Sequence, residues 1–144
     1  MTQGVTRAVA ICVVRRRDEI LVFDAYDEVE HLSYHRPLGG GIAFREHSEE
    51  AVRRELQEEI GADLEDLHLI GVFENLFELE GVPSHEIVFV YEGRFADPRM
   101  YERETFTVDE ESTTLRATWR RLDTFDMSTA PLYPDGLLEL LRRP

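Results

Sequence analysis

The chain has 144 residues and 42% of them are hydrophobic, which predicts a single domain, residues 1–144, with its own core, and excludes wholesale disorder. The formal net charge is -14, which argues against a protein that coats DNA or RNA, because such proteins need a basic face. All 16 basic residues are arginine, so mechanisms that depend on a lysine nucleophile or Schiff base are excluded.

The sequence lacks the usual signs of export or membrane insertion. Its longest apolar run, residues 8–14, is far shorter than the ~20 residues that span a bilayer, and no cleavage pattern follows it. Cys12 is the only cysteine, so an intrachain disulfide is excluded. We therefore expect a cytoplasmic protein with no membrane association and no nucleic-acid polymer as partner.

The first half of the chain predicts a hairpin, a glycine loop and a helix. Residues 8–14 and 20–23 are apolar and flank a polar stretch at 15–19, a pattern typical of two paired strands. A second extended segment runs through Tyr34 and Arg36 to Pro37, and the three glycines at 39–41 are expected to form a loop. Residues 48–60 predict a helix, with Gly61 placed to end it.

The second half of the chain predicts mostly strands. Residues 67–77 and 86–95 are rich in aliphatic and aromatic side chains and are separated by a turn at 81–84. Residues 115–122, which include Trp119, predict another strand, and residues 136–141 a short closing helix. Strands on both sides of one central helix, with a terminal helix, indicate an α/β protein whose mixed sheet is covered on both faces.

Three glutamates stand near the end of the predicted helix. Glu55, Glu58 and Glu59 have the i, i+3, i+4 spacing that brings side chains to one helix face. They should form a ridge at the border of core and solvent, beside a buried stripe that consists of Val52, Leu56 and Ile60. An exposed acid at the carbonyl end of a helix costs about 0.3–1 kcal/mol, so this position needs a compensating interaction.

A bound divalent cation would supply that compensation. Most acidic helix faces are simply solvated, but here the like charges crowd the unfavourable end and a glycine segment precedes the helix. Mg²⁺ prefers several oxygen ligands from a compact set, and glycines let backbone groups approach a ligand closely. Earlier in the helix, Glu50 precedes Arg54 by four residues, which predicts an ion pair between them.

The glycine segment and the helix together resemble the Nudix box. The shared positions have fixed spacing over 22 residues: Gly40, Glu46, Arg54, Glu55, Leu56, Glu58, Glu59 and Gly61. The resemblance implies an α/β/α sandwich with a mixed sheet and a loop–helix–loop site. It also implies Mg²⁺- or Mn²⁺-dependent hydrolysis of a phosphoanhydride bond in a nucleoside diphosphate linked to another group. A small nucleotide-type substrate and a homodimer are the partners it suggests.

The same resemblance assigns roles by position. Glu55, Glu58 and Glu59 become metal ligands, together with the carbonyl of Gly40. Glu55 is also the box residue best placed to activate water, and the catalytic group then comprises Glu55, Arg54 and Glu58. Glu46 pairs with Arg54 to orient the acids, and Gly61 supports the end of the helix. The residues that contact the substrate are not assigned.

Some positions depart from common family usage. Ala43 stands where glutamate is frequent, which removes any role for that side chain. Arg45 replaces a frequent glycine and brings a guanidinium near the expected phosphates. Ala62 replaces a bulky aliphatic residue, and the order Pro37-Leu38 is reversed. None of these changes removes an expected metal ligand. They therefore affect the expected identity of the substrate more than the expected type of reaction.

Several residues outside the box remain candidates. Glu110 and Glu111, in an expected loop, compete with Glu55 for the role of general base. His35, His85 and Glu86 are candidates to assist catalysis or to contact the substrate, although a lone histidine carries little signal. Glu86 is also a candidate for the metal site. Four aromatic residues could stack on a base, although core packing is the stronger expectation for each: Tyr34, Phe73, Phe77 and Trp119.

Two other classes of function compete with hydrolysis. A catalytically inactive nucleotide sensor or interaction module of the same fold is disfavoured because every acid of the box is present. A Ca²⁺-binding structural protein ranks last, because the glycine segment and the acids do not follow the spacing of an EF-hand loop.

Overall fold

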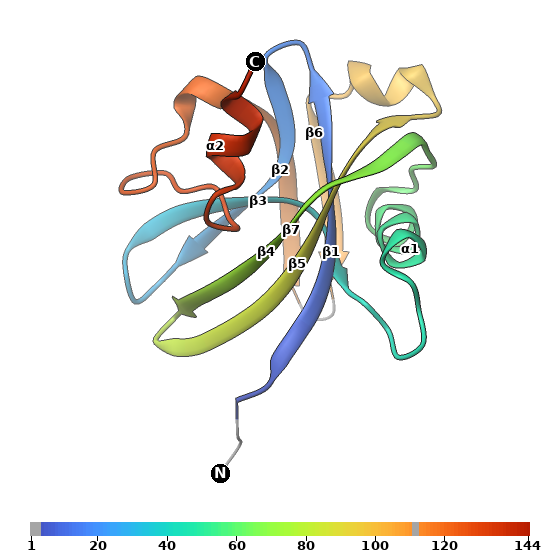
Figure 1. Ribbon diagram of the computed structural model, residues 1–144. Helices are drawn as coiled ribbons and strands as arrows, with labels where there is room; N and C mark the ends of the chain where they lie inside the picture. The colour runs from blue at the N-terminus through green and yellow to red at the C-terminus, as the bar shows by residue number, and fades with distance from the viewer. Residues whose placement is uncertain (1–3, 111–112) are drawn as a thin grey trace.

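The computed structural model describes residues 4–110 and 113–144 of the chain, and in this part seven strands form one mixed sheet (Figure 1). The order across the sheet is β4-β5-β1-β3-β2-β7-β6. The strands are β1 (Thr6–Arg16), β2 (Glu19–Asp27), β3 (Leu32–Gly41), β4 (Leu64–Leu79), β5 (Val82–Phe95), β6 (Thr105–Glu110) and β7 (Thr113–Arg121). The helices are α1 (Ser48–Ile60) and α2 (Leu137–Arg142), with single 3₁₀ turns at Pro98–Glu102 and Leu122–Thr124.

Strand β1 connects the two halves of the sheet. It pairs in parallel with β5 along most of its length, and antiparallel with β3 and then β2 on its other side. The β1–β2 hairpin expected from the apolar runs is confirmed, with Arg15 opposite Ile20. The hairpin of β4 and β5 and the strand β7 are also confirmed.

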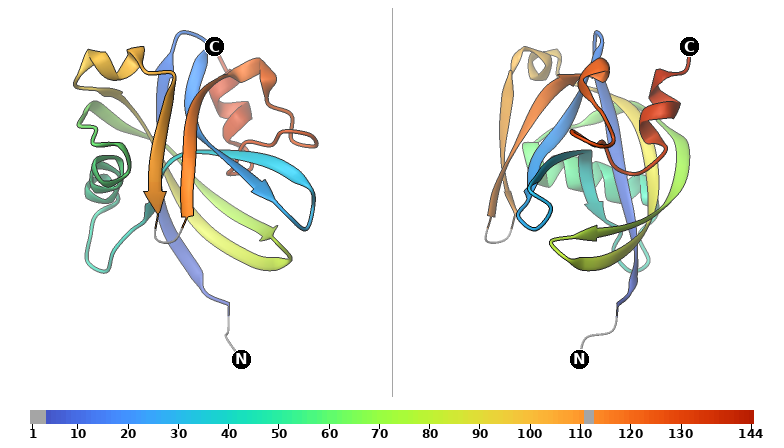
Figure 2. Two further views of the ribbon diagram at one scale, coloured as in Figure 1. Left: turned by 180° about the vertical axis from the view of Figure 1, so that it is seen from behind. Right: turned by 90° about the vertical axis from the view of Figure 1, so that its left-hand side faces the viewer.

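One helix lies on each side of the sheet (Figure 2), and each packs on its own hydrophobic cluster. On one face, Val52 and Leu56 of α1 are fully buried against residues such as Cys12 of β1. On the other face, Leu137 of α2 packs with Ile11 and neighbouring residues. This arrangement confirms the predicted α/β/α sandwich. Neither helix in the described part of the chain has the length and apolar composition needed to span a bilayer.

The glycine segment is not the loop that was expected. Gly39, Gly40 and Gly41 form the end of β3 and pair with residues 9–11 of β1. A methyl carbon added to Gly39 would lie 2.1 Å from the carbonyl oxygen of Ala10. The absence of side chains is therefore what allows this strand to approach β1.

Strand β6 was missed in the sequence. Phe106 and Val108 alternate with exposed threonines and are fully buried, which is the two-residue period of a half-buried strand. Its partner is β7, whose residue Thr113 lies opposite Glu110. Glu110 is therefore the last residue of a strand and does not lie in the expected loop, whereas Glu111 lies outside the described residues.

Candidate active site

Helix α1 is positioned by its buried face and by both of its ends. At the N-terminus, Glu50 accepts a hydrogen bond from the backbone N–H of His47 at 3.0 Å. At the C-terminus, Gly61 adopts the left-handed conformation with φ 68°, and its N–H donates to the carbonyl of Gln57 at 2.9 Å. The helix stops there, which confirms the expected position of Gly61.

The guanidinium of Arg54 donates hydrogen bonds to three acids of the box. Its Nε and Nη2 atoms donate to the two carboxylate oxygens of Glu46 at 2.8 and 2.9 Å. Its Nη1 donates to Glu55 at 3.1 Å and to Glu58 at 3.2 Å. Its Nη2 also donates to the carbonyl oxygen of Gly41 at 3.0 Å. Arg54 therefore fixes the helix to the end of β3.

The expected pair between Glu50 and Arg54 is wrong. Glu50 bonds to the backbone of His47 at the start of the helix, and Arg54 bonds to acids that lie further along it. The i, i+4 pair in the first turn joins Glu49 and Arg53 instead, at 3.6 Å. A backbone donor at the helix start offers Glu50 a closer partner than a side chain one turn away.

The carboxylate of Glu55 lies directly against Gly40. A methyl carbon added to Gly40 would fall 2.6 Å from Cδ of Glu55 and 2.7 Å from each of its oxygens. The side chain of Glu55 is only 13% exposed. This contact requires glycine at position 40 and brings the expected ligand and water-activating group to the backbone of β3.

The three acids differ more in exposure than the sequence suggested. Glu59 is buried, at 7% exposure, whereas the side chain of Glu58 is 59% exposed. Glu55, one turn earlier in the helix, lies between them in exposure. The ridge therefore runs from the interior of the molecule to solvent instead of following its border.

The ion pair at Arg54 shifts the pKa of both partners. Hydrogen bonds from Arg54, and secondly from the backbone N–H of Ala43, lower the pKa of the Glu46 carboxyl to about 2. The hydrogen bond to Glu46 is also the main cause of the raised pKa of Arg54. Both groups are therefore charged across the physiological range.

The donor set suits a hard cation such as Mg²⁺ or Mn²⁺, because every side chain in it offers carboxylate oxygens. Within residues 4–110 and 113–144, no three acidic, histidine or cysteine side chains already converge in a metal-ligand cluster. The guanidinium of Arg54 pairs with the carboxylates of Glu46, Glu55 and Glu58. A cation at this position would compete with Arg54 for Glu55 and Glu58.

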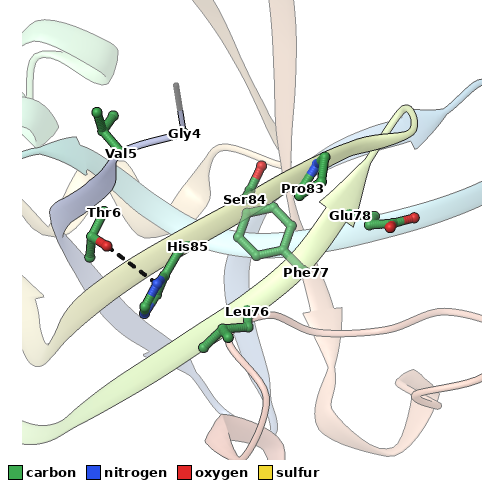
Figure 3. A pocket seen from close by; sticks show the side chains of 9 residues that line it. All are labelled: Gly4, Val5, Thr6, Leu76, Phe77, Glu78, Pro83, Ser84 and His85. Carbon is green, nitrogen blue, oxygen red and sulfur yellow. Dashed lines mark hydrogen bonds between the residues drawn. The ribbon is translucent and has the colours of Figure 1, made fainter. Parts of the chain in front are cut away.

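The two histidine candidates lie outside the box. His35 is buried, and its Nδ1 lies 3.2 Å from both Oδ1 of Asp24 and the carbonyl oxygen of Phe23. His85 contacts Thr6 at 3.3 Å in a groove of about 470 Å³ (Figure 3). The groove is formed by the start of β1, the end of β4 and the start of β5. Both histidines therefore bond to partners outside the box: Asp24 and Phe23 for His35, and Thr6 for His85.

Glu86 and the aromatic candidates divide between a pocket and the core. Glu86 is buried and lies 3.9 Å from Arg7, at the edge of a cavity of about 240 Å³ that Tyr34 and Phe77 also line. Trp119 packs in the core and donates through its indole N–H to the carbonyl of Arg103 at 2.8 Å. Phe73 packs against the cluster beneath α2. The sequence could not identify this pocket because its residues come from separate strands.

The chain is similar to known proteins in both sequence and fold. The family model described as the NUDIX domain matches residues 4–138. The chain is similar to the crystal structure of a MutT NUDIX hydrolase from Burkholderia pseudomallei, with 23% identity, a TM-score of 0.70, and coverage of 98% of this chain and 100% of that one. It is also similar to a MutT protein from Methanosarcina mazei Go1, with 17% identity, a TM-score of 0.61, and coverage of 99% and 95%.

A NUDIX hydrolase from Nitrosomonas europaea is a third similar structure, with 17% identity, a TM-score of 0.59, and coverage of 83% of this chain and 75% of that one. A comparison with curated proteins gave no significant match. The structural likenesses support the fold, and the family model extends over most of the chain, including the whole of the box. The chain belongs to the NUDIX domain family.

Proposed function

We propose that this protein hydrolyses a phosphoanhydride bond in a nucleoside diphosphate linked to another group, and that it needs Mg²⁺ or Mn²⁺ to do so. The observation that carries the proposal is the assembly at Arg54. One guanidinium orients Glu55 and Glu58, and Glu55 lies against the backbone of Gly40. A hydrolase of this class needs carboxylates held in place beside an approachable backbone, and this chain has them.

The residues of the box have different proposed roles in the reaction. Glu55, Glu58 and Glu59 would hold the cation, together with the carbonyl of Gly40. The chemistry that a bound divalent cation supplies is charge neutralisation of the diphosphate and acidification of the attacking water. The carboxylate of Glu55 is our candidate to accept the proton from that water, and Arg54 holds it in position. Glu110 and Glu111 remain the alternatives for this base.

The competing function is a nucleotide sensor that binds without turnover. The complete set of box acids favours the enzyme, because a sensor has no need for a base beside the glycine backbone. We further propose a cytoplasmic location, and a homodimer that gel filtration with light scattering would test.

The deciding experiment is a substrate panel. The purified protein is incubated with nucleoside diphosphates linked to a sugar, to a second nucleotide or to further phosphate. A phosphatase then releases the phosphate that hydrolysis exposes in the first two classes, and inorganic pyrophosphatase splits the pyrophosphate that is released from the third. We expect turnover of at least one member with Mg²⁺ or Mn²⁺, none in excess EDTA, and little on p-nitrophenyl phosphate. Full turnover in EDTA would refute the mechanism, and binding without turnover would establish the sensor.

A matched pair of variants assigns the activity to the box. Glu55→Gln keeps the shape of the side chain and removes its charge, so the rate should fall at least about a hundredfold, because metal catalysis contributes several kcal/mol. Glu49→Gln makes the same change six residues earlier in the helix, where the side chain is 57% exposed and lies 3.6 Å from Arg53. The control should retain the parental rate. Equal rates in the two variants would place the active site elsewhere.

A further inference from the structure

A second polar site lies on the opposite face of the sheet from the acids of the box. Along β2, Asp24 continues the two-residue period of Ile20 and Val22, which pack in the cluster beneath α2. The acids of the box lie on the α1 side, where Glu55 meets Gly40. Helices α1 and α2 lie on opposite sides of the sheet (Figure 1). The sheet therefore separates the surroundings of Asp24 from the box.

The carboxylate of Asp24 contacts side chains from two neighbouring strands. The hydroxyl of Thr118 lies 3.1 and 3.0 Å from its two oxygens, and Nε of Arg120 donates to Oδ1 at 3.1 Å. Nε of Arg116 lies 3.7 Å from Oδ2. Nδ1 of the buried His35 lies 3.2 Å from Oδ1. Asp24 therefore joins β2, β3 and β7 around one negative charge.

The two arginines bring two positive charges to this one carboxylate. Arg116 and Arg120 are four residues apart in β7, so their Cα atoms are about 13 Å apart, yet both side chains reach Asp24. Burial alone would raise the pKa of Asp24, but hydrogen bonds, of which that from His35 contributes most, lower it to about 2. The carboxylate thus compensates one of the two positive charges. Because like charges held close together repel each other, a second anion would complete the balance.

Both guanidinium groups are oriented to receive that anion. Each approaches Asp24 through Nε, the nitrogen nearest the backbone. The side chains of Arg116 and Arg120 are 65% and 40% exposed, whereas Asp24 is mostly covered. The exposed part of each arginine is therefore the end that carries the two Nη atoms. This end matches the oxygens of a phosphate group, which it can bind through two parallel hydrogen bonds.

The cluster opens into a groove with the size of a small-molecule site. Its volume is about 780 Å³, within the roughly 300–1,000 Å³ that is typical of ligand pockets. Tyr26 and Ser33 bring hydroxyl groups to its lining, and Leu115 brings apolar surface. Glu80, from the β4–β5 turn, is a further acid of the lining and disfavours a ligand with several anionic groups. The groove therefore suits a hydroxylated molecule with a single phosphate.

We propose that this groove binds a small sugar phosphate, with its phosphate on Arg116 and Arg120 and its hydroxyl groups on Tyr26 and Ser33. Asp24 is a positioning residue that holds the two guanidinium groups together. The site is separate from the box and does not depend on the proposed hydrolysis.

The binding test follows the Nε–H signals of the arginines by NMR in buffer without divalent cations. Glucose 6-phosphate, inorganic phosphate or glucose is added at constant ionic strength. With glucose 6-phosphate, the signals of Arg116 and Arg120 should shift together and saturate. Its affinity should be at least about fivefold higher than that of inorganic phosphate, because the sugar adds hydrogen bonds, and glucose should cause no shift. Equal affinities for the two phosphates, or saturable shifts at Arg54 alone, would overturn the proposal.

Variants locate the phosphate. Arg116→Gln and Arg120→Gln should each lower the affinity for glucose 6-phosphate at least about tenfold, because each removes hydrogen bonds to a charged group. Arg121→Gln is the matched control, because this exposed arginine follows Arg120 in β7, points to the opposite face and pairs with Asp123 and Asp18. The control should keep the parental affinity. Equal losses in all three variants would reduce the effect to overall charge and overturn the site.

Asp24→Asn tests the positioning role, because two expectations for it have opposite signs. Removal of a negative charge beside a bound phosphate would by itself raise the affinity. Loss of the group that holds Arg116 and Arg120 together should instead lower it about fivefold or more, and ¹⁵N relaxation should show greater mobility of both Nε–H bonds. A change in stability alone would move neither readout. Higher affinity, or unchanged mobility of the two arginines, would overturn the role of Asp24.

Discussion

Gly39 and Gly40 are neighbours in β3, but an added methyl group would meet different obstacles at the two positions. At Gly39 it would collide with the backbone of Ala10 and Ile11, which cannot move without disturbing β1. At Gly40 it would meet the end of the Glu55 side chain, which can rotate away. The first position limits how the strands pair, and the second limits where the carboxylate of Glu55 lies.

This difference predicts opposite phenotypes for two similar variants. Gly40→Ala should retain nearly parental stability and lose about a hundredfold in turnover, because a displacement of about 1 Å at a reacting group is enough for that loss. Gly39→Ala should lose at least about 3 kcal/mol of unfolding free energy, through overpacking and a backbone at φ 148°. Urea unfolding and a rate assay on each variant measure both effects. Parental turnover in Gly40→Ala would remove Glu55 from the site.

The pair of Glu46 and Arg54 predicts a specific dependence on pH. The pKa of Glu46 is lowered from 4.5 to about 2, so the pair stabilises the folded protein above about pH 4.5 and this stabilisation is lost as the pH falls toward 2. An NMR titration of the Glu46 carboxyl carbon should show a midpoint near the lower value. In Arg54→Met the midpoint should move up toward 4.5. A midpoint that stays low would assign the shift to the N–H of Ala43.

At the scale of single residues, the sequence identified the residues of the box but not all of the hydrogen bonds between them. Fixed spacing was enough to place Glu55, Glu58 and Gly61. The resemblance already paired Arg54 with Glu46, but it did not show that Arg54 would also bond to Glu58 instead of Glu50, because that choice depends on how the end of β3 lies against the helix. The sequence also could not show that Tyr34, Phe77 and Glu86 line one cavity, since these residues come from separate strands.

Among the elements, α1 shows most directly how a local signal defines a boundary. Gly61 ends the helix in the left-handed conformation, with no atom within 4 Å of an added methyl carbon. The cost of a side chain there is therefore confined to the backbone. Glycine is required by its φ angle and not by the space around it.

We expect Gly61→Ala to lower the unfolding free energy by about 1–2 kcal/mol, the cost of placing an L-residue in the left-handed region. For a chain of this size, that is a fall of roughly 2–8 °C in melting temperature. Gly4→Ala is the control, because its φ is unremarkable and the space around it is open. Equal melting temperatures for the two variants would show that the cap does not constrain the helix.

The elements that the sequence missed had weaker or ambiguous patterns. Strand β6 is short, and its two buried residues, Phe106 and Val108, alternate with polar ones in a stretch that also resembles a loop. Three consecutive glycines, as in β3, indicate a loop when only the neighbouring residues in the sequence are considered. Only the ladder with β1 makes them a strand, and that ladder is a property of the tertiary structure.

For the whole molecule, the net charge of -14 has a measurable effect on stability. Like charges repel one another in the compact state, so added NaCl should raise the melting temperature by screening. Mg²⁺ at the same ionic strength should raise it by several degrees more, because a ligand that binds only the folded state stabilises it by mass action. Scanning calorimetry at matched ionic strength separates the two effects.

Glu59→Gln should separate stability from activity at this scale. Its turnover should fall at least about a hundredfold, and its response to NaCl should persist while the additional gain from Mg²⁺ shrinks. In EDTA it should melt at or slightly above the parental temperature, because the change relieves repulsion from Glu55 and the helix end by about 0.5–1.5 kcal/mol. A much lower melting temperature in EDTA would show that Glu59 is structural.

The parallel ladder between β1 and β5 also sets an order of events during synthesis. Thr6 and His85 are adjacent in this ladder but 79 residues apart in the chain. The β1–β2 and β4–β5 hairpins have local partners and can form as each emerges from the ribosome. Within residues 4–110 and 113–144, β4 and β5 join the rest of the sheet through the pairing of β5 with β1. During synthesis, the edge of β1 that pairs with β5 therefore has to avoid pairing with other strands until more than half of the protein has been made.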